Sequence, residues 1–350
     1  MKPAILKTQL QSLGARLEGF SLEGRRGGAG PAEGITIEFD NTVATVPCYS
    51  SYVALSPFRI AEDKEGYWLW ENGKQITSIA FPHLKAYEEG KTSDGIPFSH
   101  IALLHGRDCL ASTVVQHCMF DCKFCGINLS LKQGRTIKLK TPSQLAEAAS
   151  AAKLAGINHL VLTSGSFNGD EIPHLIRCIS ALKEKTNLPI QIQVMPVSNR
   201  ESLKLLKDAG ADTIGIHIES FDPEVLSRVA LTKASLGMEV YIKAWEEAVD
   251  IFSPNQVTSY VIVGLGENDE SVMSGVNMLS ILGVYPYVVP FRPIPGTPLE
   301  NIRPPSHERM LRLYQRIVPL LKGAKLSSSK IKAGCGRCPA CSALPDFETC

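Results

Sequence analysis

Three closely spaced cysteines, Cys118, Cys122 and Cys125, are the residues of this sequence best suited to chemistry. Their C-x3-C-x2-C spacing lets three thiolates face one inorganic centre, and such soft ligands favour iron–sulfur, zinc or copper(I) centres. A [4Fe-4S] cluster held by three thiolates keeps one iron without a local protein ligand, and an open metal position is typical of catalytic sites. A zinc knuckle lacking its fourth ligand, or loop cysteines that bind nothing, are the alternatives.

A second group of cysteines crowds the C-terminal end. Its members are Cys335, Cys338, Cys341 and Cys350. The glycine and alanine between them suit a tight loop around a cluster, so we predict a second iron–sulfur cluster, also [4Fe-4S]. Four thiolates suit structural zinc as well. Cys350 ends the sequence, and Cys48, Cys109 or a substrate atom could replace it as the fourth ligand.

Composition and charge narrow the class of protein. The 350 residues are 44% apolar and 20% charged, which is ordinary for a globular chain with one large domain or two moderate ones. A formal charge of +1 offers no general attraction to nucleic acid or to anionic membranes. No apolar run is long enough to span a bilayer, and residues 1–10 lack a secretory core. We therefore expect a cytoplasmic protein that binds neither nucleic acid nor membrane, with cysteines that serve as metal ligands.

The first hundred residues have the pattern of a β-rich accessory domain. Residues 1–20 have a helical apolar spacing, and the glycine-rich stretch 25–31 is interpreted as a loop rather than a phosphate cradle. Period-two alternation and an Asn-Gly turn then predict hairpin strands at 35–39, 42–46, 67–70 and 75–77. We place the boundaries of this domain at residues 1–105.

Six short apolar strands alternate with helices in the central part of the chain. The predicted strands are 110–115, 159–163, 189–194, 213–218, 257–263 and 285–290, and the helices are 143–154, 171–184, 199–208, 223–248 (broken at Gly237) and 270–282. This alternation indicates parallel βα units with right-handed crossovers. The predicted fold class is α/β: a partial (βα)6 TIM-type barrel over residues 106–300, with its mouth at the C-terminal strand ends. Residues 301–350 then form a helix and the cysteine-rich tail.

The loops after these strands carry further candidate residues. Ser164, Gly165 and Ser166 follow the second strand, where small residues let the backbone approach a ligand closely. His217 points toward the lumen from the fourth strand, either to touch substrate or to pack there. Arg292 follows the sixth strand and either holds a substrate carboxylate or phosphate or lies on the surface.

The opening motif, with Phe124 directly before Cys125, resembles the radical S-adenosylmethionine (SAM) superfamily. The resemblance covers about residues 108–300 and implies that SAM chelates the open iron. It implies that the turn 164–166 holds the SAM amino group, although Ser-Gly-Ser here replaces the family's commoner double glycine and acid. It further assigns Glu219 to the ribose or amino-acid part of SAM, and the turn with Gly264 and Gly266 to the adenine.

The implied reaction is reductive cleavage of SAM, after which a 5′-deoxyadenosyl radical abstracts hydrogen from a small-molecule or carrier-protein-bound substrate. A reductant such as flavodoxin or ferredoxin is then required. The chain is similar to biotin synthase-like and lipoyl synthase-like members, including two-component lipoyl synthases and proteins of nitrilase gene clusters, so sulfur insertion is the leading reaction. A radical rearrangement or oxidation, with the auxiliary cluster as electron relay, is one alternative. A non-catalytic, zinc-stapled binding protein is the other.

Overall fold

The computed structural model describes residues 2–22, 34–82, 84–167, 171–196 and 199–349. The glycine-rich stretch 25–31 and Cys350 lie outside the described residues. Within them, no helix is both long and apolar enough to cross a membrane.

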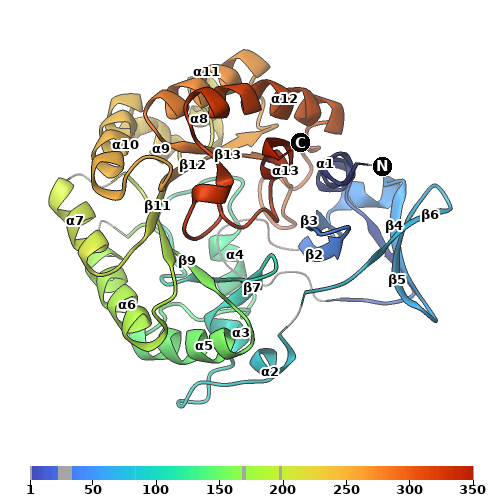
Figure 1. Cartoon of the computed structure of the whole chain (residues 1–350), viewed down its shortest axis with the longest axis horizontal. Helices are drawn as coiled ribbons and strands as arrows, with labels where there is room; N and C mark the ends of the chain where they lie inside the picture. Colours follow the sequence, from blue (N-terminus) through green and yellow to red (C-terminus); the bar gives the residue numbers. More distant parts are fainter. Residues whose placement is uncertain (1, 23–33, 83, 168–170, 197–198, 350) are drawn as a thin grey trace.

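A curved seven-stranded sheet forms the centre of the molecule (Figure 1). Its six parallel strands are β8 (Cys109–Thr113), β9 (His159–Thr163), β10 (Ile190–Val194), β11 (Thr213–Ile216), β12 (Val257–Val263) and β13 (Tyr285–Pro290). They pair in chain order, and β7 (Leu103–His105) adds an antiparallel strand beside β8. These strands are almost wholly buried, as expected when both faces of a parallel sheet are covered. The predicted partial barrel is confirmed, and β7 is the strand that the apolar pattern did not predict.

Helices cover the outside of the sheet (Figure 1). They are α5 (Pro142–Leu154), α6 (Glu171–Thr186), α7 (Arg200–Asp208), α10 (Met238–Phe252) and α11 (Asp269–Ile281). Three shorter helices follow strand ends: α4 (Ile127–Lys132) after β8, and α8 (Pro223–Val229) and α9 (Leu231–Leu236) after β11. The predicted break at Gly237 is present, because that residue has a φ of 81°. A second break at Ala230 was not predicted. Beside it, the carbonyl of Val229 accepts a hydrogen bond from the Lys123 amide of the cysteine motif.

The N-terminal residues form a small α/β layer with its own apolar core. Helix α1 (Pro3–Leu13) ends at Gly14, whose φ is 67°, so the helix predicted over residues 1–20 is wrong beyond Leu13. The strands here are β1 (Arg16–Glu18), β2 (Gly34–Phe39), β3 (Thr42–Pro47), β4 (Phe58–Asp63), β5 (Gly66–Glu71) and β6 (Lys74–Ile79). The predicted hairpins are confirmed, whereas β1 and β4 were not predicted. Side chains such as Leu10, Ile37 and Phe58 form a separate core cluster. The domain boundary at residue 105 stays a prediction.

The short helices α2 (Lys85–Glu88) and α3 (Phe98–Ile101) lead from the N-terminal layer into the barrel. The 3-10 turn η1 (Ser51–Leu55) lies within the N-terminal layer, between β3 and β4. After the barrel come α12 (His307–Gly323), the 3-10 turn η2 (Ser328–Lys330) and α13 (Leu344–Glu348). The chain between η2 and α13 is the cysteine-rich tail.

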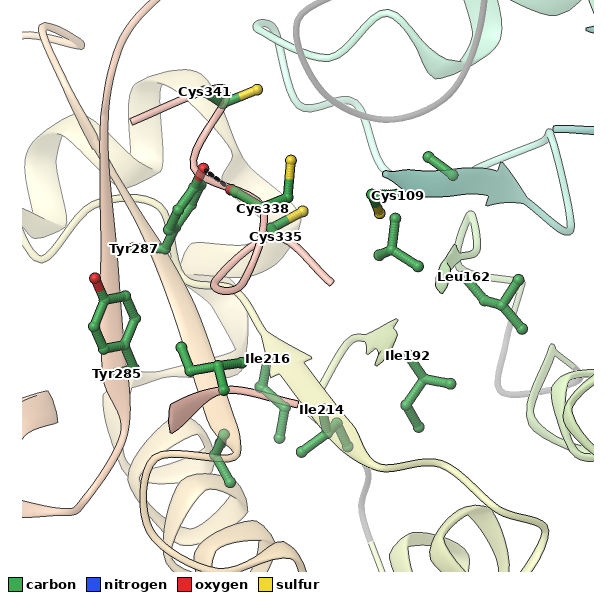
Figure 2. Close-up of a cluster of buried hydrophobic side chains, with 14 of the residues drawn as sticks. Cys109, Leu162, Ile192, Ile214, Ile216, Tyr285, Tyr287, Cys335, Cys338 and Cys341 are labelled. Atoms are coloured by element: carbon green, nitrogen blue, oxygen red, sulfur yellow. Dashed lines mark hydrogen bonds between the residues drawn. The ribbon is translucent and has the colours of Figure 1, made fainter. Parts of the chain in front are cut away.

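The tail runs along the inside of the half-barrel. At its start, the Gly334 amide donates to His159 Nδ1 (3.0 Å) and the Cys335 amide to Gln191 Oε1 (3.0 Å). Further on, the Tyr287 hydroxyl of β13 donates to the Cys338 carbonyl (3.1 Å; Figure 2). The tail cysteines therefore belong to the same apolar core as the barrel strands.

Residues of the N-terminal layer hold the tail from its other side. The Ala340 carbonyl accepts from the Thr45 amide (2.7 Å) and from Gln11 Nε2 (3.0 Å). Lys7, which is fully buried, pairs with Asp346 (2.6 Å). Segments from both ends of the chain thus enclose the tail thiols.

Lys140 is a buried cation whose stability contribution depends on pH. The residue is 1% exposed, and its ammonium donates to the Thr113 carbonyl (2.7 Å) and the Thr136 hydroxyl (2.8 Å). No described carboxylate lies within ion-pair distance of it. Burial lowers its pKa to about 7. Between that value and the ordinary lysine pKa the unfolded chain binds the extra proton, so folding stability rises with pH through this window.

We expect the unfolding free energy of the wild type, relative to that of Lys140→Met, to rise by about 1.4 kcal/mol per pH unit between about pH 7.5 and 8.5. Denaturant titrations of the metal-free protein measure this slope. The exposed Lys204 on α7 provides the control, because Lys204→Met should leave the pH dependence of the wild type unchanged. Parallel curves for wild type and Lys140→Met would contradict the prediction.

Candidate active site

One cavity at the C-terminal strand ends brings most of the predicted site residues together. Those that line it are Cys118, Cys122, Phe124, Cys125, Ser164, Gly165, Ser166, His217, Glu219, Arg292 and Cys341. The tail cysteines Cys335 and Cys338 lie outside this lining, and so do Gly264 and Gly266. The cavity therefore extends from the opening cysteine motif to the tail.

The opening motif is held by three neighbouring parts of the barrel. The Met119 amide donates to the Ser166 carbonyl (3.1 Å) and the Lys123 amide to the Val229 carbonyl (2.8 Å). The side chain of Asn128, on α4, accepts from the Cys118 amide (3.2 Å) and donates to the Cys118 carbonyl (3.1 Å). Asn128 was not among the predicted site residues, and only its nearness to the motif could have indicated it.

The donor set of the opening motif fits an iron–sulfur cluster. Burial raises the pKa of Cys122 to about 12 and that of Cys125 to about 11, so thiolates at this site need a positive centre to stabilise them. Within the described ranges, no three His, Cys, Asp or Glu side chains converge closely enough to hold a single metal ion. A cubane cluster holds its thiolates farther apart than one tetrahedral ion does. The absence of a single-ion site is therefore compatible with a [4Fe-4S] cluster at the motif.

The turn at residues 164–166 packs directly against the motif. A Cβ at Gly165 would collide with the His117 carbonyl oxygen and would lie 3.0 Å from Cys118 Cβ, so the approach requires glycine. The Ser166 amide donates to Cys118 Sγ (3.3 Å). The small residues of this turn therefore permit a close approach to the motif, whereas their approach to a ligand and a contact with SAM stay predictions.

Glu219 forms a buried ion pair that the sequence did not indicate. Lys233 Nζ, from α9, lies 2.7 and 2.5 Å from the two Glu219 carboxylate oxygens and also donates to the His217 carbonyl (2.8 Å). Both residues are 7% exposed. Burial lowers the pKa of Lys233, but the Glu219 carboxylate, together with Tyr241 and Cys122, outweighs burial and holds that pKa above the ordinary lysine value. The pair therefore stays charged at the cavity wall.

His217 is a neutral donor that faces the cavity. Its Nδ1 accepts from the Tyr260 amide (3.1 Å), so the proton of the neutral ring is on Nε2. Burial lowers the pKa of His217 well below its usual value, and Lys233 adds to the effect. Buried Nε2 has no hydrogen-bond partner among the described residues. A ligand in the cavity can supply the missing acceptor.

Arg292 is buried, so the surface interpretation is wrong. The side chain is 9% exposed and its Nη2 donates to the Cys341 carbonyl (3.2 Å). Buried Nη1 has no partner among the described residues, and no described carboxylate lies within ion-pair distance of the guanidinium. A buried cation with an unpaired N–H group favours an anionic ligand at this end of the cavity.

The tail thiols are buried around the end of β7. Cys335, Cys338 and Cys341 are 5%, 1% and 3% exposed. A Cβ at Gly106 would lie 2.5 Å from Cys338 Sγ, so this glycine leaves room for the thiol. Figure 2 shows the three side chains projecting from one short loop that lies opposite Cys109. These three buried thiols fit the predicted second cluster.

The other cysteines differ in where they lie. Cys109 is fully buried at the start of β8 and belongs to the same core cluster as the tail cysteines (Figure 2). Cys48 packs against the core of the N-terminal layer, where burial raises its pKa to about 12. Cys178 is a core thiol of α6. Cys109 and Cys48 both stay candidates for a fourth tail ligand.

In the turn that contains Gly264 and Gly266, two backbone amides form hydrogen bonds with a side chain of the same turn. The Gly264 and Leu265 amides donate to the Glu267 carboxylate (2.8 and 2.9 Å), and Arg309 pairs with the same carboxylate (3.1 Å). These backbone donors are occupied, and the two glycines lie outside the cavity lining. Adenine binding by this turn stays a prediction from the resemblance.

Comparison with known proteins places the site in context. Residues 112–279 match the model of the Radical SAM superfamily. The chain is 30% identical to a biotin synthase of Hydrogenobaculum sp. (strain Y04AAS1), over 53% of this chain and 56% of that protein. It is 24% identical to the mitochondrial lipoyl synthase 1 of Trypanosoma cruzi (strain CL Brener), over 48% of this chain and 40% of that protein. The matches thus span about half the length of these relatives.

The fold is similar to that of a solved structure of methylornithine synthase. The TM-score is 0.51 at 18% sequence identity, over 76% of this chain and 79% of that chain. At this identity the likeness concerns the fold. It agrees with the half-barrel of this chain.

Proposed function

The chain belongs to the radical SAM superfamily, and on that basis we propose that its cavity binds SAM at the opening motif and an anionic substrate at Arg292. The observation that carries this proposal is the shared lining: three motif thiols, the buried Arg292 and one tail thiol, Cys341, face the same cavity. Cys118, Cys122 and Cys125 would hold a [4Fe-4S] cluster, and Cys335, Cys338 and Cys341 a second iron–sulfur cluster.

Held by Cys118, Cys122 and Cys125, a bound cluster with SAM would supply the reactivity: one-electron reductive cleavage of SAM and abstraction of a hydrogen atom from substrate, with methionine and 5′-deoxyadenosine as products. The protein's part is to bind, orient and exclude water. His217 would donate its Nε2–H to a bound ligand, and the Glu219–Lys233 pair offers a fixed carboxylate near the motif thiols. Burial of these groups strengthens their interactions with a bound ligand.

The cavity wall suggests the class of substrate. Near Arg292, the lining is apolar and includes Val289, Phe291 and Ile294. An anionic group paired with Arg292 and an apolar body against these side chains would satisfy both the unpaired guanidinium N–H and the wall. We therefore propose a small or carrier-bound substrate with a carboxylate or phosphate group and an aliphatic portion.

Insertion of sulfur is the reaction that we propose for the substrate. Two observations support it: the similar proteins include a biotin synthase and a lipoyl synthase, and Cys341 lines the substrate end of the cavity. The tail cluster would supply the sulfur atom. Incubation with reductant, SAM and an octanoylated carrier protein is expected to give a thiolated product. Oxidised product with 5′-deoxyadenosine and without thiolation would favour the electron-relay alternative.

Metal analysis tests the two-cluster proposal directly. Anaerobically reconstituted protein should contain about eight irons and eight sulfides, and alanine at Cys335, Cys338 and Cys341 should reduce both to about four. The buried Cys178 is the matched control, because Cys178→Ala should retain about eight irons. About four irons in the wild type, lost on substitution of the opening motif, would contradict the second cluster. Zinc without iron would contradict the whole proposal.

A further inference from the structure

Two side-chain nitrogens contact the sulfur atoms of the tail. His105, the last residue of β7, places Nε2 3.1 Å from Cys341 Sγ. Gln193, in β10, places Nε2 3.2 Å from Cys335 Sγ. Both side chains are buried, at 4% and 8% exposure. The contacts thus lie where hydrogen bonds are only weakly screened by water.

The direction of each hydrogen bond follows from its surroundings. Gln191 Oε1 accepts from Gln193 Nε2 (3.3 Å) and from the Cys335 amide (3.0 Å), which fixes the Gln193 amide with its NH2 group toward sulfur. For His105 the argument is chemical. A thiolate that binds metal carries no proton and can only accept, so Nε2 must donate to Cys341 Sγ once metal is bound.

Charged groups of both signs lie around the tail thiols: Lys7 pairs with Asp346, and the Asp108 carboxylate interacts electrostatically with Cys338. Lys7 is fully buried, and its ammonium interacts electrostatically with Cys338 and Cys341. Arg292 donates to the Cys341 carbonyl. By contrast, the hydrogen bond that the structure describes to an opening-motif sulfur comes from a backbone amide, that of Ser166. Hydrogen bonds to cluster sulfurs and nearby positive charge stabilise the reduced, more negative state of a cluster.

We propose that His105 is a positioning residue whose Nε2–H donates a hydrogen bond to the Cys341 thiolate and raises the reduction potential of the tail cluster. This inference rests on the proposed second cluster. Cys341 also differs from Cys335 and Cys338, because it lines the cavity and its sulfur accepts the hydrogen bond from the imidazole N–H. The consequence is a tail cluster that takes up an electron more readily than it would with an apolar residue at position 105.

A redox titration of the tail cluster alone tests the proposal. The 350-residue chain with Cys118, Cys122 and Cys125 changed to alanine lacks the opening motif and keeps the tail cysteines. This parent variant is reconstituted anaerobically. His105→Leu is then compared with His105→Gln, which keeps an N–H donor close to the imidazole Nε2 position. Electron paramagnetic resonance follows the reduced cluster at stepped potentials, so the readout does not depend on catalysis.

We expect His105→Leu to shift the midpoint to more negative potential by at least about 59 mV, a tenfold fall in the ratio of reduced to oxidised cluster for one electron. His105→Gln should recover most of the shift. His159→Leu is the matched control, since His159 is buried and bonded to the tail backbone at Gly334 but to no sulfur; its midpoint should stay at the parent value.

Each other outcome has a separate meaning. Absence of iron in the parent triple variant would overturn the second cluster, on which the inference depends. Retained iron with an unchanged midpoint in His105→Leu would overturn the role of His105 alone. Loss of iron in His105→Leu would also overturn the positioning role, and would make His105 a ligand. An equal shift in His159→Leu would assign the effect to disturbance of the tail rather than to the hydrogen bond.

Discussion

Cys122→Ala is expected to lower the rate of 5′-deoxyadenosine formation by about 10³-fold or more, which corresponds to about 4 kcal/mol of transition-state stabilisation. Cys122 is the middle cysteine of the opening motif and lines the cavity. Its sulfur is one of the three thiolates that the motif offers to the proposed cluster. Without this sulfur, two thiolates remain to hold the cluster. Burial at this position disfavours a charged group that could replace the thiolate as a ligand. The iron bound at the motif should fall in parallel.

The measurement is chromatographic quantification of 5′-deoxyadenosine after incubation with SAM and dithionite under anaerobic conditions. Cys178→Ala serves as control, because that thiol is fully buried in the core of α6, away from the cavity lining. Its rate should match the wild type. A Cys122→Ala protein that still forms 5′-deoxyadenosine at the wild-type rate would show that the motif is not the site of SAM cleavage.

Lys233→Met is expected to lower the free energy of unfolding by about 3–5 kcal/mol, the usual effect of removing one partner of a buried ion pair. Lys233 contacts both Glu219 carboxylate oxygens, and methionine would leave that carboxylate buried without a counter-charge. The double variant Glu219→Gln/Lys233→Met removes both charges and should be more stable than Lys233→Met alone. Denaturant unfolding of the metal-free wild type, Lys233→Met and the double variant measures the three free energies of unfolding.

The loss in Lys233→Met should also depend on pH. Burial raises the pKa of the Glu219 carboxyl, and in the variant no cation opposes it. The folded variant then binds a proton more readily than the unfolded chain, so its stability falls as pH rises from about 5 to 8. Lys243→Met on α10, at an exposed position, is the control and should change stability by no more than about 0.5 kcal/mol. Equal stability of Lys233→Met and wild type at pH 8 would refute the buried-pair argument.

The alternation of apolar strands and helices was sufficient to predict the half-barrel, because parallel strands buried on both faces must be apolar throughout. The strands β8 to β13 follow that pattern closely. The local patterns failed where a partner far away in the chain decides the structure. β1 has three residues and exists through its parallel pairing with β4, and the break of the helix at Ala230 lies beside the hydrogen bond from Lys123 to Val229.

The residue types of the opening motif and their spacing were enough to predict which thiols gather, since neighbours in a short loop are neighbours in space. The sequence by itself also determined the family resemblance and the presence of a second cysteine group. Only the tertiary structure decided that Arg292 is buried, that Lys233 neutralises Glu219, and that Cys341 shares a cavity with Cys118. The same holds for His105, which lies 236 positions from Cys341 in the chain yet 3.1 Å from its sulfur. Such contacts depend on how the tail packs inside the sheet, and no local spacing of residues records that packing.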